Sequence, residues 1–208
     1  MPKSEANPAR LGRPRNKAAI SHAVIMDAVY ELLQEKSARD LTMEAVARRA
    51  KVGKPTLYKW WPSKAALIMA MFQERLARQA EILGTETVEQ SIRAKLQHFV
   101  RELNGLFGKV MADLIAEGQS DPTILRELYE QHISSRRAST AADIERAKAN
   151  GEFHPDTNPE LLIDAIFSPP YYRLLLRLEP LTEETANELV DQVLNGVRNP
   201  GNIANTGA

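Results

Sequence analysis

The residues best suited to chemistry in this chain lie in one short stretch, LTMEAVARRAKVGKPTLYKWWPSKAAL, which runs from residue 41 to residue 67. Its second half is rich in ammonium groups, hydroxyl groups and aromatic rings. Groups of this kind contact phosphates and the edges of bases. The residues concerned are Lys54, Thr56, Tyr58, Lys59, Trp60 and Lys64. A segment this polar makes a poor hydrophobic core, so it indicates nucleic-acid binding, although similar short helices also occur in proteins that never touch DNA.

Catalytic and metal-binding chemistry has no support in the sequence. The chain contains no cysteine, which excludes disulfides, thiolate metal sites and cysteine nucleophiles. The four histidines form no His-x-x-x-His pair and adjoin no cluster of carboxylates: His22, His98, His132 and His154. No nucleophile elbow, glycine-rich phosphate loop or spaced acid pair is present. We therefore expect no enzyme, no cofactor and no metal ion.

The hydrogen-bond donors of residues 54–64 must be positioned by two short helices and a tight turn. Thr42 suits the N-cap of a first helix that ends near Ala50. Residues 51–53, Lys-Val-Gly, form the turn. Pro55 suits the first position of a second helix, which ends near Trp61. This arrangement describes a helix-turn-helix.

The helix that follows the helix-turn-helix begins with a capping residue and a lysine. Ser63 is the expected N-cap, and Lys64 lies in the first turn. There, the ammonium group and the free backbone N–H groups of the helix are able to hold one phosphate together.

Helical periodicity extends over most of the chain. In a helix from Lys17 to about Lys36, apolar side chains recur every four residues at Ile20, Val24, Ala28 and Leu32. Further helices are expected at 63–84, 87–103, 111–119, 122–149, 159–178 and 182–197. No segment has the period of a strand, so the expected class is all-α with about nine helices. The expected divisions are a flexible basic arm (1–16), a helix-turn-helix domain (17–63), a connecting helix (64–84), a ligand-binding and dimerisation domain (85–198) and a disordered tail (199–208).

Charge is distributed unevenly although the net charge is zero. Residues 1–75 contain fourteen Lys and Arg against seven Asp and Glu, whereas the remainder contains thirteen against twenty. A basic N-terminal third suits a polyanionic partner, and an acidic remainder would be repelled by DNA; chance clustering on a solvated surface is the alternative. Residues 1–15 lack the apolar segment of a secretory signal, and no run of about 18 apolar residues is present. We expect a cytoplasmic protein.

The N-terminal arm offers a second contact with DNA. Its Leu-Gly-Arg-Pro-Arg segment, residues 11–15, is narrow and extended, so Arg13 and Arg15 are able to enter a narrow minor groove. The alternative is a basic tail that adds only nonspecific attraction.

The C-terminal two-thirds is predicted to bind a small, largely apolar molecule and to dimerise. Most of its large apolar side chains are core by default, and some of them must line any cavity. The candidate lining residues are Phe99, Leu103, Phe107, Met111, Tyr129, His132, Phe167 and Tyr171, with Glu117, Gln119, Arg136 and Arg137 as candidate polar partners. The segments Leu161–Leu178 and Thr182–Val197 are apolar enough to form a homodimer interface. Burial inside the monomer is the alternative.

The stretch from about residue 17 to residue 70 resembles the TetR family of transcriptional regulators. The resemblance is carried by Leu41-Thr42, Ala47, Val52, Thr56-Leu57-Tyr58, Trp61 and Lys64, which lie in register with turn, recognition helix and following helix. It implies a dimeric repressor that binds an inverted-repeat operator and that a small effector releases. An architectural DNA-binding protein without an effector is the alternative.

The resemblance also implies individual roles. Tyr58 and Lys64 are expected to contact phosphate, and Lys54, Pro55 and Thr56 to face the major groove. Trp61 is expected in the core and Trp60 at the edge of the DNA. Two features depart from the family. Lys51 occupies a turn position that is commonly glycine and that requires a left-handed backbone, and Pro169-Pro170 is expected to kink the penultimate helix.

Overall fold

The structure, a computed structural model, describes residues 15–79 and 87–195, with side chains for 21–75 and 87–195. In these residues the chain is all-helical, which confirms the predicted class. The elements are α1 (Arg15–Glu35), α2 (Met43–Arg49), α3 (Lys54–Trp60), α4 (Lys64–Gln79), α5 (Val88–Leu103), α6 (Leu106–Gly118), α7 (Pro122–Leu128), a π-helical turn η1 (Tyr129–Ile133), α8 (Ser134–Ala149), α9 (Pro159–Leu175) and α10 (Glu183–Asn195). Within the described ranges, α7, η1 and α8 run on as one helix, so nine separate helices result.

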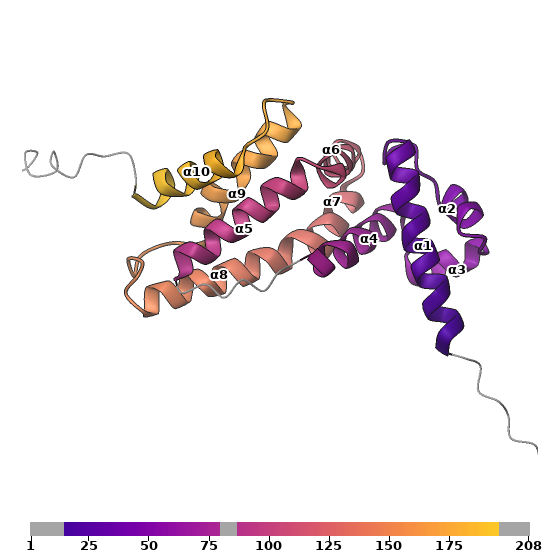
Figure 1. Ribbon diagram of the computed structural model, residues 1–208, viewed down its shortest axis with the longest axis horizontal. Coiled ribbons are helices and arrows are strands. Elements are labelled where there is room, and N and C mark those ends of the chain that lie inside the picture. Colours follow the sequence, from indigo (N-terminus) through magenta and orange to yellow (C-terminus); the bar gives the residue numbers. More distant parts are fainter. Residues whose placement is uncertain (1–14, 80–86, 196–208) are drawn as a thin grey trace, which may run out of the picture.

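The helices form a small unit and a larger one. α1, α2 and α3 lie at one end of the molecule, α5 to α10 form the larger part, and α4 lies between them (Figure 1). α4 packs against α1 on one side and against α7 and η1 on the other. The element that follows the helix-turn-helix is therefore shared by both units.

The core of the small unit follows the predicted helical period of α1, with one exception. Ile25, Val29 and Leu32 are buried against α2 and α4, whereas Val24 is exposed. Ala28 and Leu32 of the predicted stripe are buried, as are the flanking Ile25 and Val29, so Val24 is the one described apolar residue of this pattern that faces solvent. Trp61 is buried, as expected for a core residue.

The capping residues lie where the sequence predicts them. The Thr42 hydroxyl accepts a hydrogen bond from the Ala45 N–H at 3.1 Å, and the Ser63 hydroxyl accepts one from the Ala66 N–H at 2.9 Å. Each bond satisfies a backbone donor that the first turn of a helix leaves free. Lys51 has φ of 53°, which confirms the left-handed turn residue.

α6 begins earlier than predicted. Two glycines, Gly105 and Gly108, precede the helix that the sequence predicts from residue 111, and they suggest a break in the chain; α6 instead starts at Leu106, and Gly108 lies inside it. A Cβ atom at Gly108 would lie 1.8 Å from the Leu103 carbonyl oxygen. Glycine is therefore required here because α6 passes very close to the end of α5, and not because the chain breaks.

The predicted long helix from residue 122 to 149 contains an irregular turn. The Asp121 side chain caps its start by accepting from the Thr123 N–H at 3.0 Å, as expected for an Asp-Pro start. At Tyr129–Ile133 the hydrogen bonding widens to a π-helical turn. Single π turns inside α-helices often occur at functional sites, because the extra residue changes the direction of nearby side chains.

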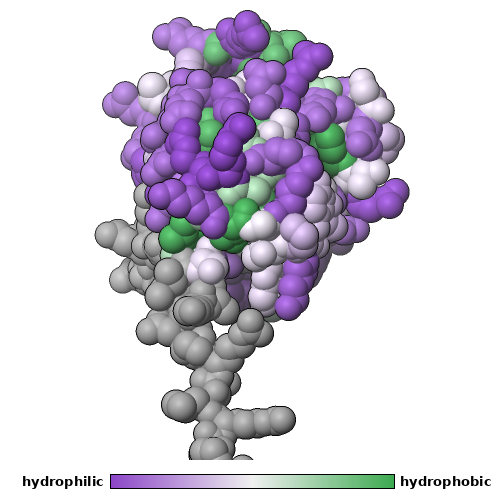
Figure 2. Space-filling view, turned by 90° about the vertical axis from the view of Figure 1, so that its right-hand side faces the viewer, coloured by the Kyte–Doolittle hydropathy of each residue, from purple (hydrophilic) through white to green (hydrophobic). Residues whose placement is uncertain are grey.

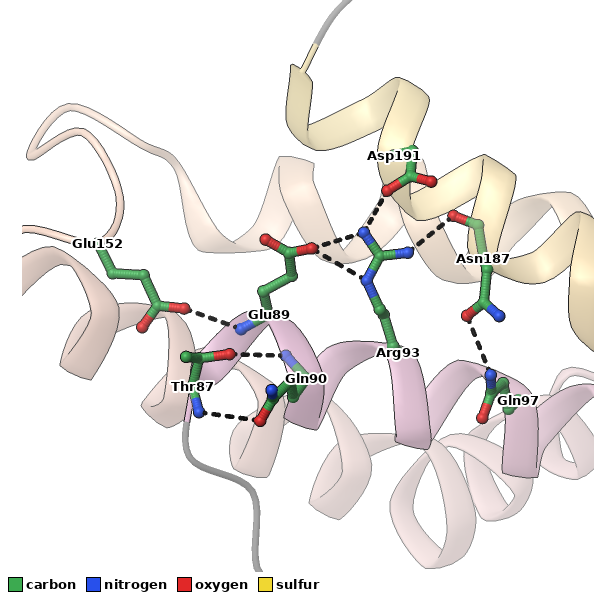
Figure 3. A network of polar contacts seen from close by, with 8 residues as sticks. All are labelled: Thr87, Glu89, Gln90, Arg93, Gln97, Glu152, Asn187 and Asp191. Atoms are coloured by element: carbon green, nitrogen blue, oxygen red, sulfur yellow. Dashed lines mark hydrogen bonds and ion pairs between the residues drawn. The ribbon is translucent and has the colours of Figure 1, made fainter.

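The last two helices pack on α5 through polar contacts as well as apolar ones. The Arg93 guanidinium contacts Glu89, the Asn187 carbonyl oxygen at 3.1 Å and Asp191, and the Gln97 amide donates to Asn187 at 3.0 Å (Figure 3). These bonds hold α10 on α5.

α9 contains Pro169 and Pro170, where a kink was expected, and it ends at Leu175 instead of the predicted Leu178.

We expect Gly108→Ala to destabilise the protein strongly. The new methyl group would collide with backbone atoms of Leu103, which belong to the end of α5 and do not move independently. The free energy of unfolding, measured by chemical denaturation at fixed protein concentration, should fall by roughly 3 kcal/mol. Gly105→Ala is the matched control, because its nearest neighbour would lie at 3.5 Å, and it should cost less than about 1 kcal/mol. Equal losses would show that the close approach is not the reason for Gly108.

Candidate functional site

α3 presents a polar and aromatic surface at the free end of the small unit. Its only buried side chain is Leu57, which anchors it on the core. Lys54, Pro55, Tyr58, Lys59 and Trp60 are all exposed, and Trp60 is 62% exposed. Figure 2 views the molecule from this end, where the surface is mostly hydrophilic with a few small apolar patches. The residues predicted for the recognition helix therefore share one accessible element.

Some exposed side chains of α3 are held in place by contacts with neighbouring residues. The Lys59 ammonium lies 5.7 Å from the centre of the Trp60 ring. Lys54 forms an ion pair with Glu44 of α2, and this hydrogen-bonded contact raises the pKa of Lys54. Thr56 is half-buried at the start of the helix, and Thr42 is exposed at the start of α2. The sequence did not indicate that Glu44 would meet Lys54.

Lys64 lies differently from the position that the resemblance implies. Its ammonium is 3.0 Å from a Glu117 carboxylate oxygen and 3.3 Å from the Arg39 carbonyl oxygen, and its side chain is 19% exposed. In this conformation Lys64 is therefore occupied by an internal carboxylate and is not free for a phosphate. Helical spacing did not reveal this pair because Glu117 lies 53 residues further along the chain.

Two more contacts join the same regions. The Ser63 hydroxyl donates to Glu127 of α7, and the Ala38 N–H donates to Asp113 of α6 at 2.9 Å. Together with Glu117, these acids hold the start of α4 and the turn after α1 against the larger unit. Three carboxylates on the acidic part of the chain thus bind the basic helix-turn-helix region.

The larger unit contains a cavity of about 400 Å³ between α4, α5, η1, α8 and α9. It is lined by Gln73, Lys95, His98, Phe99, Gln131, His132, Ile133, Ser135, Arg136, Arg137, Ser139, Thr140, Ile163, Asp164, Phe167, Ser168 and Tyr171. The Phe99 ring lies 5.0 Å from Tyr171 and 6.2 Å from Phe167, centre to centre, so these three rings form an aromatic wall. Cavities of this size and lining accommodate small organic molecules.

Half of the predicted lining residues reach this cavity. Phe99, His132, Phe167 and Tyr171 line it, as do Arg136 and Arg137 among the candidate polar partners. Phe107 and Met111 are buried core, Leu103 lines a separate hollow of about 310 Å³, and Tyr129 is exposed. Glu117 pairs with Lys64, and Gln119 donates to the Ile115 carbonyl oxygen.

Apart from His132, Arg136 and Arg137, most of the polar residues that line the cavity were not predicted from the sequence. The polar side of the cavity comes largely from α8 and the turn before it, where Gln131, Ser135 and Ser139 recur at intervals of four on the same side as Arg136. This spacing is visible in the sequence, but polar residues on a solvent-exposed helix face have the same spacing. Only the packing of α9 and α5 across it shows that these residues enclose a space.

A buried charge cluster forms one side of the cavity. The Glu102 side chain is 3% exposed and accepts from Arg136 at 2.8 and 3.1 Å, and His98 Nε2 lies 2.7 Å from the same carboxylate. A buried carboxylate is stable only with such partners. Burial raises the pKa of Tyr171 to about 12, so its phenol stays protonated.

His132 on the π turn is buried and incompletely satisfied. Its side chain stacks on Phe107 at 4.8 Å, and its Nε2 has no hydrogen-bond partner among the described residues. Burial, with a smaller effect of the Arg136 charge, lowers the pKa of His132 to about 3. The imidazole is therefore neutral over the physiological range of pH.

Part of the predicted dimer surface is exposed on α9. Leu161, Tyr172 and Leu175 of α9 are exposed, as is Leu176 at its C-cap, and Leu161 is 66% exposed. α10 differs, because Val190 is fully buried and its neighbours pack against α5 and α9. Burial inside the monomer thus accounts for the core-facing side of α10 but not for these α9 residues.

The remaining predictions concern residues near the ends of the chain, metal sites and membrane-spanning helices. Arg13 and the tail 199–208 lie outside the described residues, and Arg15 is the first residue of α1. In the described part of the chain, no group of three His, Cys, Asp or Glu side chains is placed to hold a metal ion. No helix there is long and apolar enough to cross a membrane.

Two known families match the chain. Residues 25–71 match the bacterial regulatory proteins of the tetR family, and residues 82–193 match the tetracyclin repressor-like C-terminal domain. The first match covers the helix-turn-helix and the start of α4, and the second covers the helices that enclose the cavity, apart from α4.

Curated proteins and solved structures of the same kind are similar over nearly the whole chain. The HTH-type transcriptional regulator YdeS of Bacillus subtilis is 33% identical over 90% of this chain and 93% of its own length. The DNA-binding transcriptional repressor TetR of Mycobacteroides abscessus is 28% identical over 87% of this chain and 95% of its own. The crystal structure of the TetR family transcription regulator SCO0332 superposes with a TM-score of 0.73 at 30% identity, covering 89% of this chain and 100% of that one.

We expect Lys51→Gly to stabilise the protein while it weakens DNA binding slightly. Glycine relieves the left-handed strain at φ of 53°, worth roughly 1 kcal/mol, and the substitution removes one positive charge near α3. Thermal unfolding and DNA-binding titrations measure the two effects. Lys51→Ala is the control, because it removes the same charge but keeps the strain, so it should weaken binding equally and give no gain in melting temperature. A higher melting temperature for both variants would mean that removal of the charge, and not relief of backbone strain, stabilises the protein.

Proposed function

This chain belongs to the tetR family of bacterial regulatory proteins, and we propose that it is a sequence-specific transcriptional repressor that a small-molecule effector releases from its operator. The family consists of DNA-binding transcription regulators and not of enzymes. A protein with this task works in the cytoplasm, where bacterial DNA lies. The observation that carries the proposal is that one helix, α4, begins beside α3 and contributes Gln73 to the wall of the cavity.

The proposed operator contacts come from α3, with support from its surroundings. Lys54, Pro55 and Thr56 enter the major groove, and Tyr58 binds phosphate. The remaining contacts are assigned to Thr42, Lys59, Trp60 at the edge of the DNA, and the arm residues Arg13 and Arg15 in the minor groove. Lys64 takes a phosphate only after it leaves Glu117, so DNA binding breaks one of the contacts between the two units.

The proposed functional unit is a homodimer joined through α9 and α10. The exposed apolar residues of α9 need a partner surface, and a second copy of the same helix supplies it through two-fold symmetry. Two symmetric recognition helices then read two half-sites about 34 Å apart, which corresponds to an inverted repeat.

The effector is proposed to bind in the 400 Å³ cavity, whose aromatic wall suits a largely apolar small molecule. A ligand there contacts α8, α9 and Gln73 at once. Any preference of the ligand for a shifted α4 moves the start of that helix, and with it α3. The two recognition helices of the dimer then no longer match successive major grooves.

The dimer interface has a direct test. Replacing both Leu161 and Tyr172 by Glu places like charges in the proposed contact, so the variant should sediment as a monomer. Its affinity for an inverted repeat should fall about 100-fold, because the second half-site is no longer bound by a tethered copy. Tyr129→Glu, a similar change at an exposed aromatic residue outside α9, should remain dimeric. A double variant that stays dimeric would place the interface elsewhere.

The switch is tested by linkage between operator and effector. Compounds that release the operator, found by screening small apolar molecules, should bind typically about 5- to 150-fold more weakly when the operator is present, because coupling between two sites is reciprocal. Calorimetric titrations with and without operator measure this factor.

The control for the switch is Phe167→Trp, which fills part of the cavity. It should bind the operator normally and resist release by the same compounds. Equal ligand affinities with and without operator would contradict the switch and favour an architectural DNA-binding protein.

A further inference from the structure

The cavity holds more charged groups than an apolar ligand needs, and each of its cations already has an anionic partner. The Lys95 ammonium lies 2.7 Å from Asp143, Arg136 lies 2.8 Å from Glu102, and Arg137 lies 2.6 Å from Asp164. Asp164 is the one carboxylate in the lining, and Arg137 also contacts Glu160. A charged ligand would therefore find no counterion free to receive it, and burying its charge would be costly.

The same cavity keeps hydrogen-bond donors that have no partner. Arg136 uses one N–H of each terminal nitrogen for Glu102, so its Nε–H and two further N–H groups have no partner among the described residues. Burial keeps the Tyr171 phenol protonated, so its hydroxyl, in the aromatic wall, is a further donor. Because a guanidinium offers five donors and no acceptor, the surplus here consists mainly of donors.

Glu102 holds the Arg136 guanidinium in place. The two-bond contact fixes the plane of the guanidinium, and the buried position of Glu102 makes a rearrangement expensive. Arg136 also lies 6.0 Å from the centre of the Phe99 ring, next to Phe167 and Tyr171. A fixed donor thus stands directly beside an apolar aromatic wall.

We propose that the effector is an uncharged molecule with an aromatic or other apolar body and a hydrogen-bond acceptor, such as a carbonyl oxygen, that Arg136 binds. This inference rests on the proposed function, since it describes the ligand of the same cavity. Glu102 acts as a positioning residue, and Tyr171 is a second donor to the same group.

The test compares three molecules of one shape with the full-length protein. 2-Acetylnaphthalene carries a carbonyl, 2-naphthoate carries a negative charge in its place, and 2-ethylnaphthalene lacks any acceptor. Equilibrium dialysis should show that the ketone binds about tenfold or more tightly than the hydrocarbon, which corresponds to one hydrogen bond to a charged donor. The ketone should also bind more tightly than the carboxylate. A carboxylate that binds most tightly would overturn the inference that the ligand is uncharged.

Variants identify the donor. Arg136→Met keeps an unbranched, flexible stem but has no N–H, so the preference for the ketone over the hydrocarbon should disappear. Because this change leaves Glu102 buried without its partner, the double variant Glu102→Gln, Arg136→Met removes both charges and should show the same loss. Arg137→Met is the matched control in the same cavity, since the Arg137 guanidinium is occupied by Glu160 and Asp164, and it should keep the preference. A preference that survives in the double variant would overturn the role of Arg136.

Failure of this inference is distinguishable from failure of the proposed function. If the ketone and the hydrocarbon bind equally and Phe167→Trp excludes both, the cavity is a ligand site but the acceptor inference is wrong. If Phe167→Trp changes the binding of neither compound, the probes bind outside the cavity, and both the acceptor inference and the proposed effector site are contradicted. Operator binding, measured separately, tests the DNA-binding part of the function in either case.

Discussion

Burial of the first half of α4 is the constraint on which both parts of the molecule depend. Residues 65–69 are five consecutive buried residues, so no face of the helix in this region meets solvent. A helix that is apolar all round belongs to a core and not to a surface. α4 therefore has no freedom to adjust to one neighbour alone. A displacement near Gln73, in the cavity wall, must be absorbed by α1 and by the start of α4, where the contacts with Glu117 and Glu127 lie.

Local features of this fold were predictable from the sequence because local chemistry determines them. Thr42, Ser63 and Asp121 are caps whose side chains bond to backbone groups two or three residues away. The left-handed backbone at Lys51 follows from the tight turn that links two short helices. None of these features depends on a residue far along the chain, and the all-helical class follows from the same periodicity.

The features that could not be predicted from the sequence depend on contacts between residues far apart along the chain, or on which residues surround the cavity. Lys64 and Glu117 meet across two units, so no spacing rule connects them. Gly108 resembles a helix breaker until the backbone of Leu103 is seen beside it. Phe107, a core residue, and Phe99, a cavity residue, have the same character in the sequence, and only the packing of neighbouring helices separates them. The π turn at His132 likewise leaves no mark in the hydrophobic pattern.

The ion pair between Lys64 and Glu117 has a consequence for how salt acts on this protein. A lysine that is surrounded by water before it binds DNA replaces a mobile ion, and the release of DNA counterions makes binding fall steeply with salt. In the proposed operator complex, Lys64 exchanges the Glu117 carboxylate for a phosphate, and this exchange frees Glu117 to bind a cation of its own. Part of the ion release at the phosphate is thereby cancelled at Glu117. On this proposal, we expect the ionic-strength dependence of operator binding to understate the number of phosphates that the protein contacts.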